Sequence, residues 1–292
     1  MGGQRPWWEQ IVLIAWRFMK QFVHIVTGKS EVERIVLLEH VGGVEGTRRL
    51  RHSLERSKKL DGVFKTMITG NPQTSSAVEE IKRIKALSQI NEEGAQRLST
   101  YVGNICDVTR FIQDVERLQS EPYSSENPAH EAKLEELWNL ATDSRPREGG
   151  RISREWNRIG FQGKDPASDF RGGGVHALNQ LLYFSSTRTG AVRQQLEDLG
   201  NAEKWHPWAC TGINITSHVT SMVKDRLFDN QLYGLDRETQ FQRLNEIYSD
   251  IFESFHVDWI QSNPKTVMDF PPVFKKSVEQ ARRQYKESSS PI

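Results

Sequence analysis

Apolar residues recur at intervals of three and four along most of the chain, which is the spacing of an amphipathic helix. The clearest case is the segment 239–260, whose apolar positions are Phe241, Leu244, Tyr248, Ile251, Phe252, Phe255 and Trp259. The same spacing predicts helices over 105–118, 134–141 and 214–228, and one that begins near Val175. No sustained alternation of apolar and polar residues indicates a strand, and no internal repeat is visible. The pattern therefore predicts an all-α fold, a helical bundle.

The N-terminal segment 7–26 has an unusually wide apolar face. On a helix, its charged residues Glu9, Arg17 and Lys20, together with His24, fall within about 80° of arc. Such a helix either lies in a membrane interface or covers the core of its own protein. The tryptophans at positions 7 and 8 and the basic stretch 48–59 favour the interface, so we expect peripheral membrane contact through residues 7–26.

Composition narrows the class of protein. The chain has 292 residues, 39 basic and 38 acidic side chains and 36% hydrophobic residues, enough apolar content for one large or two modest cores. A net charge of +1 argues against a general nucleic-acid-binding protein. No apolar run reaches the length of a membrane-spanning helix. Two cysteines, Cys106 and Cys210, cannot form a disulfide framework, which fits a cytoplasmic protein.

Several short motifs resemble known sites but lack an essential residue. The sequence TGKS at 27–30 ends like a phosphate-binding loop, yet Val23 occupies the place of its first glycine. The pair His130–Glu131 lacks the second histidine of a zinc protease motif. The motif NIT at 214–216 is interpreted as a helix cap instead of a glycosylation site. Three scattered potential metal ligands remain, and we predict no metal site from them: His206, Cys210 and His218.

The segment 155–174 differs from the rest because it contains five glycines and a proline between two helical patterns. Arg171 is followed by three glycines, whose lack of a side chain lets an arginine approach another molecule closely. A guanidinium group is planar, permanently charged and suited to phosphate oxygens. The alternative is that Arg171 pairs with Asp165 or Asp169 and only holds the loop together. The pattern alone favours that structural alternative.

The stretch Trp156–Phe184, WNRIGFQGKDPASDFRGGGVHALNQLLYF, resembles the signature of the ELMO domain. More specifically, it is similar to the small ELMO-domain-containing (ELMOD) proteins. The likeness extends to 122–141 and 212–216, and more weakly to TGKSEVERI near the N-terminus. The resemblance implies a helical protein that acts in membrane traffic as a GTPase-activating protein for Arf and Arf-like GTPases.

The resemblance also implies the roles of residues. Arg171 corresponds to the arginine finger, so it is the expected catalytic residue. The chain would then need no cofactor of its own, because the partner GTPase carries GTP and magnesium, and it would act on no substrate of its own. The residues expected to bind the partner or shape the loop are Trp156, Gly160, Phe161, Gln162, Gly163, Asp165, Pro166, Ser168, Asp169, Phe170, Gly172 and Gly174.

Within that set, we expect Asp169 to orient Arg171, and the aromatic residues to pack the loop onto the helices. For Gln162, a hydrogen bond to the loop backbone is favoured over contact with the GTPase or its nucleotide. Two positions depart from the family pattern. Ser168 replaces the usual threonine and keeps the hydroxyl, whereas Gly173 replaces a larger residue, which predicts a looser loop and puts the level of activity in question.

The resemblance completes the predicted domain organisation. We expect a basic amphipathic N-terminal helical segment over 1–60, a helical part over 61–125 that packs on the ELMO domain, and the ELMO domain over 126–292. One alternative function is a non-catalytic ELMO-type adaptor that binds regulators of small GTPases. Another is an adaptor that tethers partners at an intracellular membrane.

Overall fold

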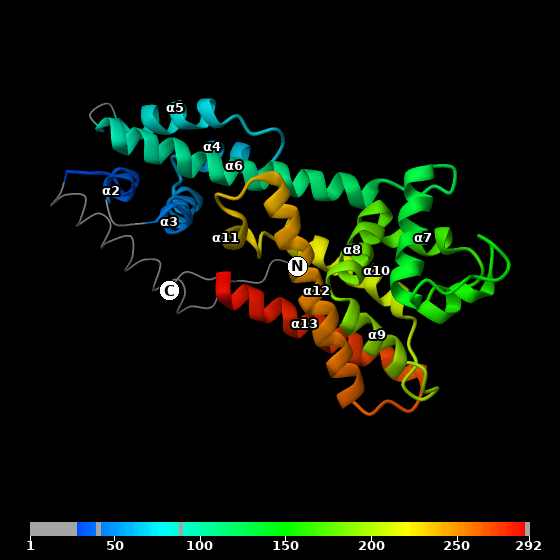
Figure 1. Cartoon of the computed structure of the whole chain (residues 1–292). Coiled ribbons are helices and arrows are strands. Elements are labelled where there is room, and N and C mark those ends of the chain that lie inside the picture. The colour runs from blue at the N-terminus through cyan, green and yellow to red at the C-terminus, as the bar shows by residue number, and fades with distance from the viewer. Residues whose placement is uncertain (1–27, 39–41, 88–89, 290–292) are drawn as a thin grey trace. The chain divides into compact units, whose positions relative to one another are not determined.

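The computed structural model describes residues 28–38, 42–87 and 90–289 (Figure 1). Within these ranges, all regular secondary structure is α-helix or 3-10 helix and no strand occurs, so the predicted all-α fold is confirmed. No helix among the described residues is long and apolar enough to cross a bilayer. The predicted amphipathic segment 7–26 lies outside the described residues.

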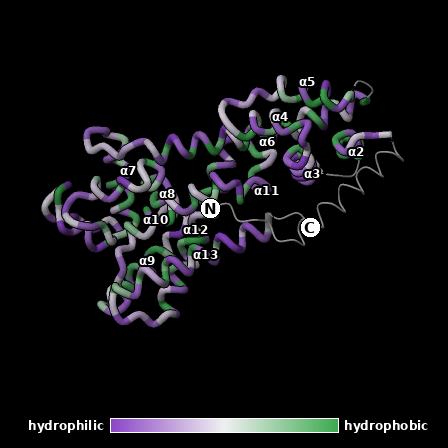
Figure 2. Tube along the Cα trace, turned by 180° about the vertical axis from the view of Figure 1, so that it is seen from behind, coloured by the Kyte–Doolittle hydropathy of each residue, from purple (hydrophilic) through white to green (hydrophobic). Residues whose placement is uncertain are grey.

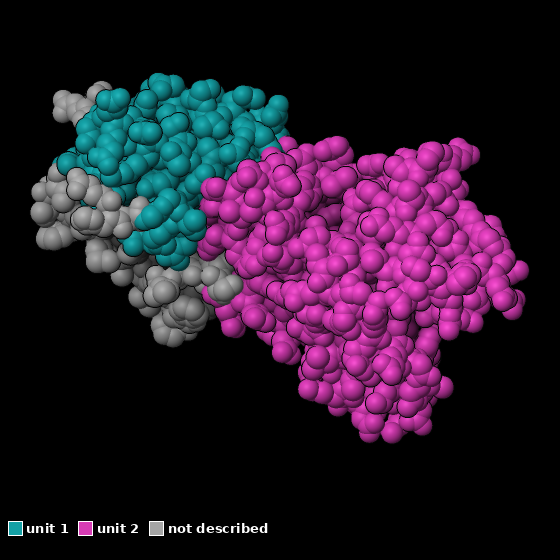
Figure 3. All heavy atoms as spheres, in the orientation of Figure 1, with its two compact units in different colours: residues 1–110 teal, residues 111–292 magenta. Residues whose placement is uncertain are grey.

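The chain divides into two compact units, residues 1–110 and 111–292 (Figure 3). The boundary falls inside the long helix α6 (Glu92–Ser120). The three segments proposed from the sequence, 1–60, 61–125 and 126–292, stay a prediction.

Unit 1 consists of short amphipathic helices and the first part of α6. Its other elements are α2 (Glu31–Leu37), α3 (Gly43–Arg56), α4 (Asp61–Ile68) and α5 (Thr74–Lys85). The basic stretch 48–59 lies in α3 and the turn after it. Because Leu50 and Leu54 of this stretch are fully buried while Arg49 and Arg56 are exposed, α3 turns one face to the core of unit 1 and its basic face outward.

Unit 2 is a larger helical bundle that carries three short 3-10 helices among its described residues. After the end of α6, its elements are α7 (Pro128–Thr142), η1 (Arg154–Ile159), η2 (Pro166–Gly172), α8 (Gly174–Thr187), α9 (Thr189–Asp198), α10 (Trp208–Lys224), α11 (Asp229–Leu232), α12 (Arg237–Gln261), η3 (Val267–Asp269) and α13 (Phe270–Ser289). Hydrophobic and hydrophilic residues are interspersed along these helices (Figure 2), as expected where one face of a helix packs on the core and the other faces solvent.

Helix α8 is the centre of the bundle, in contact with α7, α10 and α12. Gly212 of α10 allows this close packing, because a Cβ atom there would lie 2.5 Å from Leu181 and 2.6 Å from the hydroxyl of Tyr248. Phe252 of α12 stacks on Phe184 of α8, with ring centroids 5.0 Å apart. These contacts bury apolar side chains of all three helices in one core.

The helix predicted over 239–260 is α12, and the one expected near Val175 is α8. The prediction of a helix over 214–228 with a cap at Asn214 was wrong at both ends, because α10 begins before Asn214 and ends at Lys224. Helix α10 begins at Trp208, directly after Pro207, so Asn214 lies in its interior. Proline is favoured just before or at the first helical position, since its missing N–H is not needed there.

The end of α6 meets the start of α8 at Gly174. This residue has φ of +56°, and a Cβ atom on it would lie 2.5 Å from the carbonyl oxygen of Glu121 and even closer to that of Gln119. The same Glu121 carbonyl accepts a hydrogen bond from the Val175 amide at 2.9 Å. Replacing Gly174 by alanine therefore combines backbone strain with a clash against main-chain atoms that cannot move aside.

We expect Gly174→Ala to lower the free energy of unfolding by at least about 2 kcal/mol, measured by urea denaturation. Gly190→Ala is the matched control. Gly190 lies in α9 with open space around its Cβ position, so alanine there should be neutral or stabilising by up to about 1 kcal/mol. Equal stability of the two variants would contradict the packing at Gly174.

Candidate functional site

The candidate site is residues 151–174, here called the arginine loop, which contains η1 and η2. Short 3-10 helices have poorer hydrogen-bond geometry than α-helices, so side chains must hold this segment in place. Four buried rings do so in sequence: Trp138 of α7 contacts Trp156 at 5.3 Å, Trp156 contacts Phe161 at 5.7 Å, and Phe161 contacts Phe170 at 5.6 Å between centroids. Phe170 then stacks on Tyr123 at 5.0 Å. The three aromatic residues of the loop thus point into the core.

Arg147 lies over the rings of Trp138 and Trp156 in this series of aromatic contacts. Its guanidinium carbon lies 4.0 Å from the ring centroid of Trp156 and 5.3 Å from that of Trp138. Glu135 pairs with the same guanidinium group. The cation–π contacts and the ion pair together hold the side chain of Arg147 in place, so its role is structural. No sequence spacing indicates this role, because Glu135 lies in α7 and Arg147 lies beyond its end.

Arg151 links the start of the loop to η2. It donates to Asp165 at 2.7 Å and to Glu131 of α7 at 3.0 Å. Asp165 also caps η2 by accepting a hydrogen bond from the amide of Ala167 at 2.9 Å, and Pro166 occupies the first position of that helix. Burial favours a higher pKa for Asp165, but the bonds from Arg151 and Ala167 outweigh it and hold this pKa below its usual value. Asp165 is therefore engaged by Arg151.

Asp169 is held by other groups as well. One of its oxygens accepts a hydrogen bond from the backbone amide of Gln162 at 2.7 Å, and its carboxylate also interacts with the thiol of Cys210 on α10. Burial raises the pKa of Asp169, although both hydrogen bonds and the charge of Arg171 act in the opposite direction. Burial, with the negative charge of Asp169, raises the pKa of Cys210 to about 12. Cys210 is thus a neutral hydrogen-bonding group.

Arg171 lies in the last turn of η2 with an exposed side chain. Its Nε atom donates to the carbonyl oxygen of Ser168 at 2.8 Å, which fixes the base of the guanidinium group. Within the described residues Arg171 forms no ion pair, and its two terminal nitrogens have no hydrogen-bond partner. The structural alternative, in which Arg171 pairs with Asp165 or Asp169, is not the observed arrangement.

Two glycines let the loop approach α10. Gly160 has φ of +81°, and a Cβ atom there would clash with the backbone nitrogen of Trp208. The carbonyl oxygen of Gly160 accepts a hydrogen bond from the amide of Cys210 at 3.3 Å. At the other end, the hydroxyl of Ser217 donates to the carbonyl oxygen of Gly172 at 2.8 Å. The loop is therefore attached to α10 on both sides of Arg171.

The remaining loop residues fill supporting positions. Gly163 has φ of +72°, a conformation that favours glycine even though the space around it is open. The hydroxyl of Ser168 donates to the carbonyl oxygen of Asp165 at 3.0 Å. Gly173 lies against Ala177 and Ile213, whose atoms would be 2.5 and 3.3 Å from an added Cβ. The position is closely packed without a larger residue, and the expected effect of Gly173 on activity stays a prediction.

The other candidates from the sequence are distributed over the fold. His206 packs among aromatic residues near Trp259, Cys210 faces Asp169, and His218 contacts Phe274. In the part of the chain that the structure describes, no three potential ligands come together in a way that could hold a metal ion.

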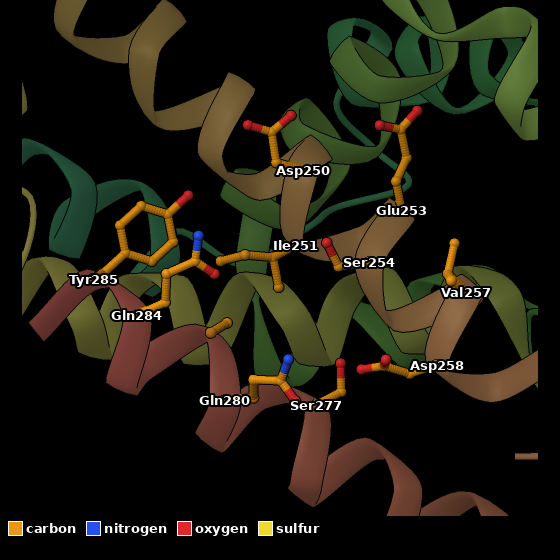
Figure 4. A pocket seen from close by; sticks show the side chains of 11 residues that line it. Asp250, Ile251, Glu253, Ser254, Val257, Asp258, Ser277, Gln280, Gln284 and Tyr285 are labelled. Carbon is orange, nitrogen blue, oxygen red and sulfur yellow. The ribbon is translucent and has the colours of Figure 1, made fainter. Parts of the chain in front are cut away.

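A separate groove of about 550 Å³ lies between α12 and α13 (Figure 4). Its lining includes Asp250, Glu253 and Asp258, of which the first two form ion pairs with Arg188. No residue of the arginine loop lines this groove.

Comparison with known proteins identifies relatives over nearly the whole chain. The sequence profile of the ELMO/CED-12 family matches residues 113–274. ELMO domain-containing protein B of Dictyostelium discoideum is 31% identical, over 90% of this chain and 93% of that protein. Human ELMO domain-containing protein 2 is 30% identical, over 90% of this chain and 89% of its own length. ELMO domain-containing protein 1 of Pongo abelii is 30% identical, over 89% and 85% respectively. No solved structure matches the chain.

The contact between Asp169 and Cys210 predicts how the thiol reacts. Removing the negative charge by Asp169→Asn should lower the pKa of Cys210 and so raise the thiolate fraction at a given pH. We expect alkylation of Cys210 by iodoacetamide at pH 9 to become about tenfold faster, corresponding to about one pKa unit, as followed by mass spectrometry. The buried Cys106 is an internal control whose rate should not change. Unchanged alkylation of Cys210 would show that Asp169 does not act on the thiol.

Proposed function

The chain belongs to the ELMO/CED-12 family, and from this premise we propose that it activates GTP hydrolysis by Arf and Arf-like small GTPases, with Arg171 as the arginine finger. One observation carries the proposal: Arg171 has an exposed guanidinium group with two uncommitted nitrogens, on a loop whose acidic residues are engaged by other groups. A guanidinium group that served only to pin the loop would be paired with one of those acids.

The chemistry of GTP hydrolysis explains what such a group does. Negative charge develops on the γ-phosphate oxygens and on the bridging oxygen as the reaction proceeds. An arginine supplied by another protein stabilises this charge and accelerates hydrolysis by roughly 10³–10⁵-fold, which is about 4–7 kcal/mol. The two terminal nitrogens of Arg171 can donate in parallel to two phosphate oxygens. Lysine has no planar fork of this kind.

The structure of the loop lowers the cost of that contact. The base of the guanidinium group is held by Ser168, and the adjoining backbone is fixed by Asp165 and by the bond from Ser217 to Gly172. A preorganised group loses less conformational entropy when it engages its target. Gly172 is exposed and has no side chain, which leaves room for a partner beside Arg171. The GTP and magnesium belong to the partner in this proposal.

The proposal predicts the effect of Arg171→Lys. This change keeps the charge but removes the bidentate fork, so acceleration of GTP hydrolysis should fall by about 10²-fold or more. The measurement is single-turnover hydrolysis with a panel of Arf and Arf-like proteins. Arg154→Lys is the matched control, because Arg154 is exposed on the same loop. This variant should accelerate GTP hydrolysis to within about twofold of the unchanged chain.

Two outcomes would contradict the proposal in different ways. Equal acceleration by Arg171→Lys and the unchanged chain would remove the finger assignment. Absence of any acceleration across the panel, together with nucleotide-independent binding to a regulator of small GTPases, would favour the adaptor function instead.

A further inference from the structure

Some of the polar side chains between Gly160 and Gly174 form hydrogen bonds or ion pairs within the loop, and others do not. Asp165 pairs with Arg151, Ser168 donates to a backbone carbonyl, and Asp169 accepts from the loop backbone. Three exposed polar side chains in this stretch have groups without a hydrogen-bond partner among the described residues: Gln162, Lys164 and Arg171.

Asp169 interacts with two of these three residues. It accepts the backbone amide of Gln162 at 2.7 Å, and its charge interacts with that of Arg171 two residues further on. Lys164 is fixed elsewhere, because its carbonyl oxygen accepts the amide of Ser153 at the beginning of the loop. The carboxylate of Asp169 thus holds the backbone of Gln162 and interacts with the charge of Arg171, whereas no such interaction links it to Lys164.

The backbone on both sides of Gln162 is also restrained. Asn157 donates to the carbonyl oxygen of Phe161 at 2.8 Å, and the ring of Phe161 is buried. Gly163 follows with φ of +72°. The sequence favoured a hydrogen bond from the side chain of Gln162 to the loop backbone, but among the described residues that side chain makes no hydrogen bond, and the backbone amide of Gln162 donates to Asp169 instead. The side-chain amide is therefore not needed to stabilise the loop. The backbone that carries Gln162 is therefore held in place, and its exposed side-chain amide is available to a partner.

We propose that Gln162 enters the nucleotide site of the partner GTPase together with Arg171 and orients the attacking water. The inference rests on the proposed function of the chain as a GTPase activator. A glutamine side chain carries one carbonyl acceptor and two N–H donors. It accepts a hydrogen bond from the water while donating one to a γ-phosphate oxygen, as a glutamine of the GTPase does in related reactions.

The reaction leaves Gln162 chemically unchanged. The water oxygen forms a bond to the γ-phosphorus as the bond between that phosphorus and the bridging oxygen breaks. The electron pair of the broken bond stays on the β-phosphate of GDP, and the proton of the water passes to the released phosphate. Arg171 stabilises the charge of the leaving oxygen, and Gln162 fixes the direction of attack.

Single-turnover hydrolysis with two versions of one responsive GTPase tests this assignment. One version is unchanged, and in the other its own water-orienting glutamine is replaced by leucine. We expect the unchanged chain to accelerate GTP hydrolysis by both versions. The Gln162→Ala variant should not accelerate hydrolysis by the leucine version. With the unchanged GTPase, Gln162→Ala should lower the maximal rate by about 10²-fold, while the concentration for half-maximal acceleration changes by less than about threefold.

Lys164→Ala is the matched control, since it removes an exposed polar side chain from the same loop; its maximal rate should equal that of the unchanged chain. Denaturation midpoints of both variants should also match, because neither side chain holds the loop. A full maximal rate with Gln162→Ala, or a change only in the half-maximal concentration, would overturn the role of Gln162. Either outcome would leave the assignment of Arg171 intact, provided that Arg171→Lys is inactive in the same assay. No acceleration by the unchanged chain would overturn both proposals.

Discussion

The arginine loop depends on a series of contacts between buried aromatic rings. The rings of Trp156, Phe161 and Phe170 are almost completely buried, and each contacts the next. Burying a ring of this kind contributes on the order of 2–3 kcal/mol. Backbone hydrogen bonds in two short 3-10 helices could not supply comparable stability. Because apolar burial fixes the loop, its polar side chains need not all be used for folding.

The charged residues divide into two groups for the same reason. Arg147 and Arg151 are held by Glu135, Glu131 and Asp165, and they connect the loop to α7. Arg171 forms no ion pair among the described residues, although its charge is close enough to favour a lower pKa for Asp169. An exposed pair would be worth no more than about 1 kcal/mol, so leaving Arg171 unpaired costs the fold little. The net charge of the chain conceals this division of roles.

The sequence predicts helices well where one face is continuously apolar. Helix α12 follows its heptad-like spacing closely, with Leu244, Phe252 and Trp259 fully buried. The start of α10 was missed because Asn214 is typical of a cap, while the apolar stripe continues back to Trp208. Local periodicity also cannot reveal contacts between distant residues, such as Arg151 with Glu131 or Asp169 with Cys210. Those contacts set the environment of Arg171, so the pattern alone favoured the wrong partner for it.

The glycines around Arg171 serve three physical purposes that their sequence pattern does not separate. Gly160 and Gly174 permit close approach to other backbone segments, at Trp208 and Glu121 respectively. Gly163 supplies a left-handed turn in open space. Gly172 leaves the surface beside the arginine without a side chain while Ser217 holds its carbonyl group. A loop built in this way is rigid where it meets the protein and open where Arg171 and Gln162 are exposed, which is the arrangement that a group acting on another molecule requires.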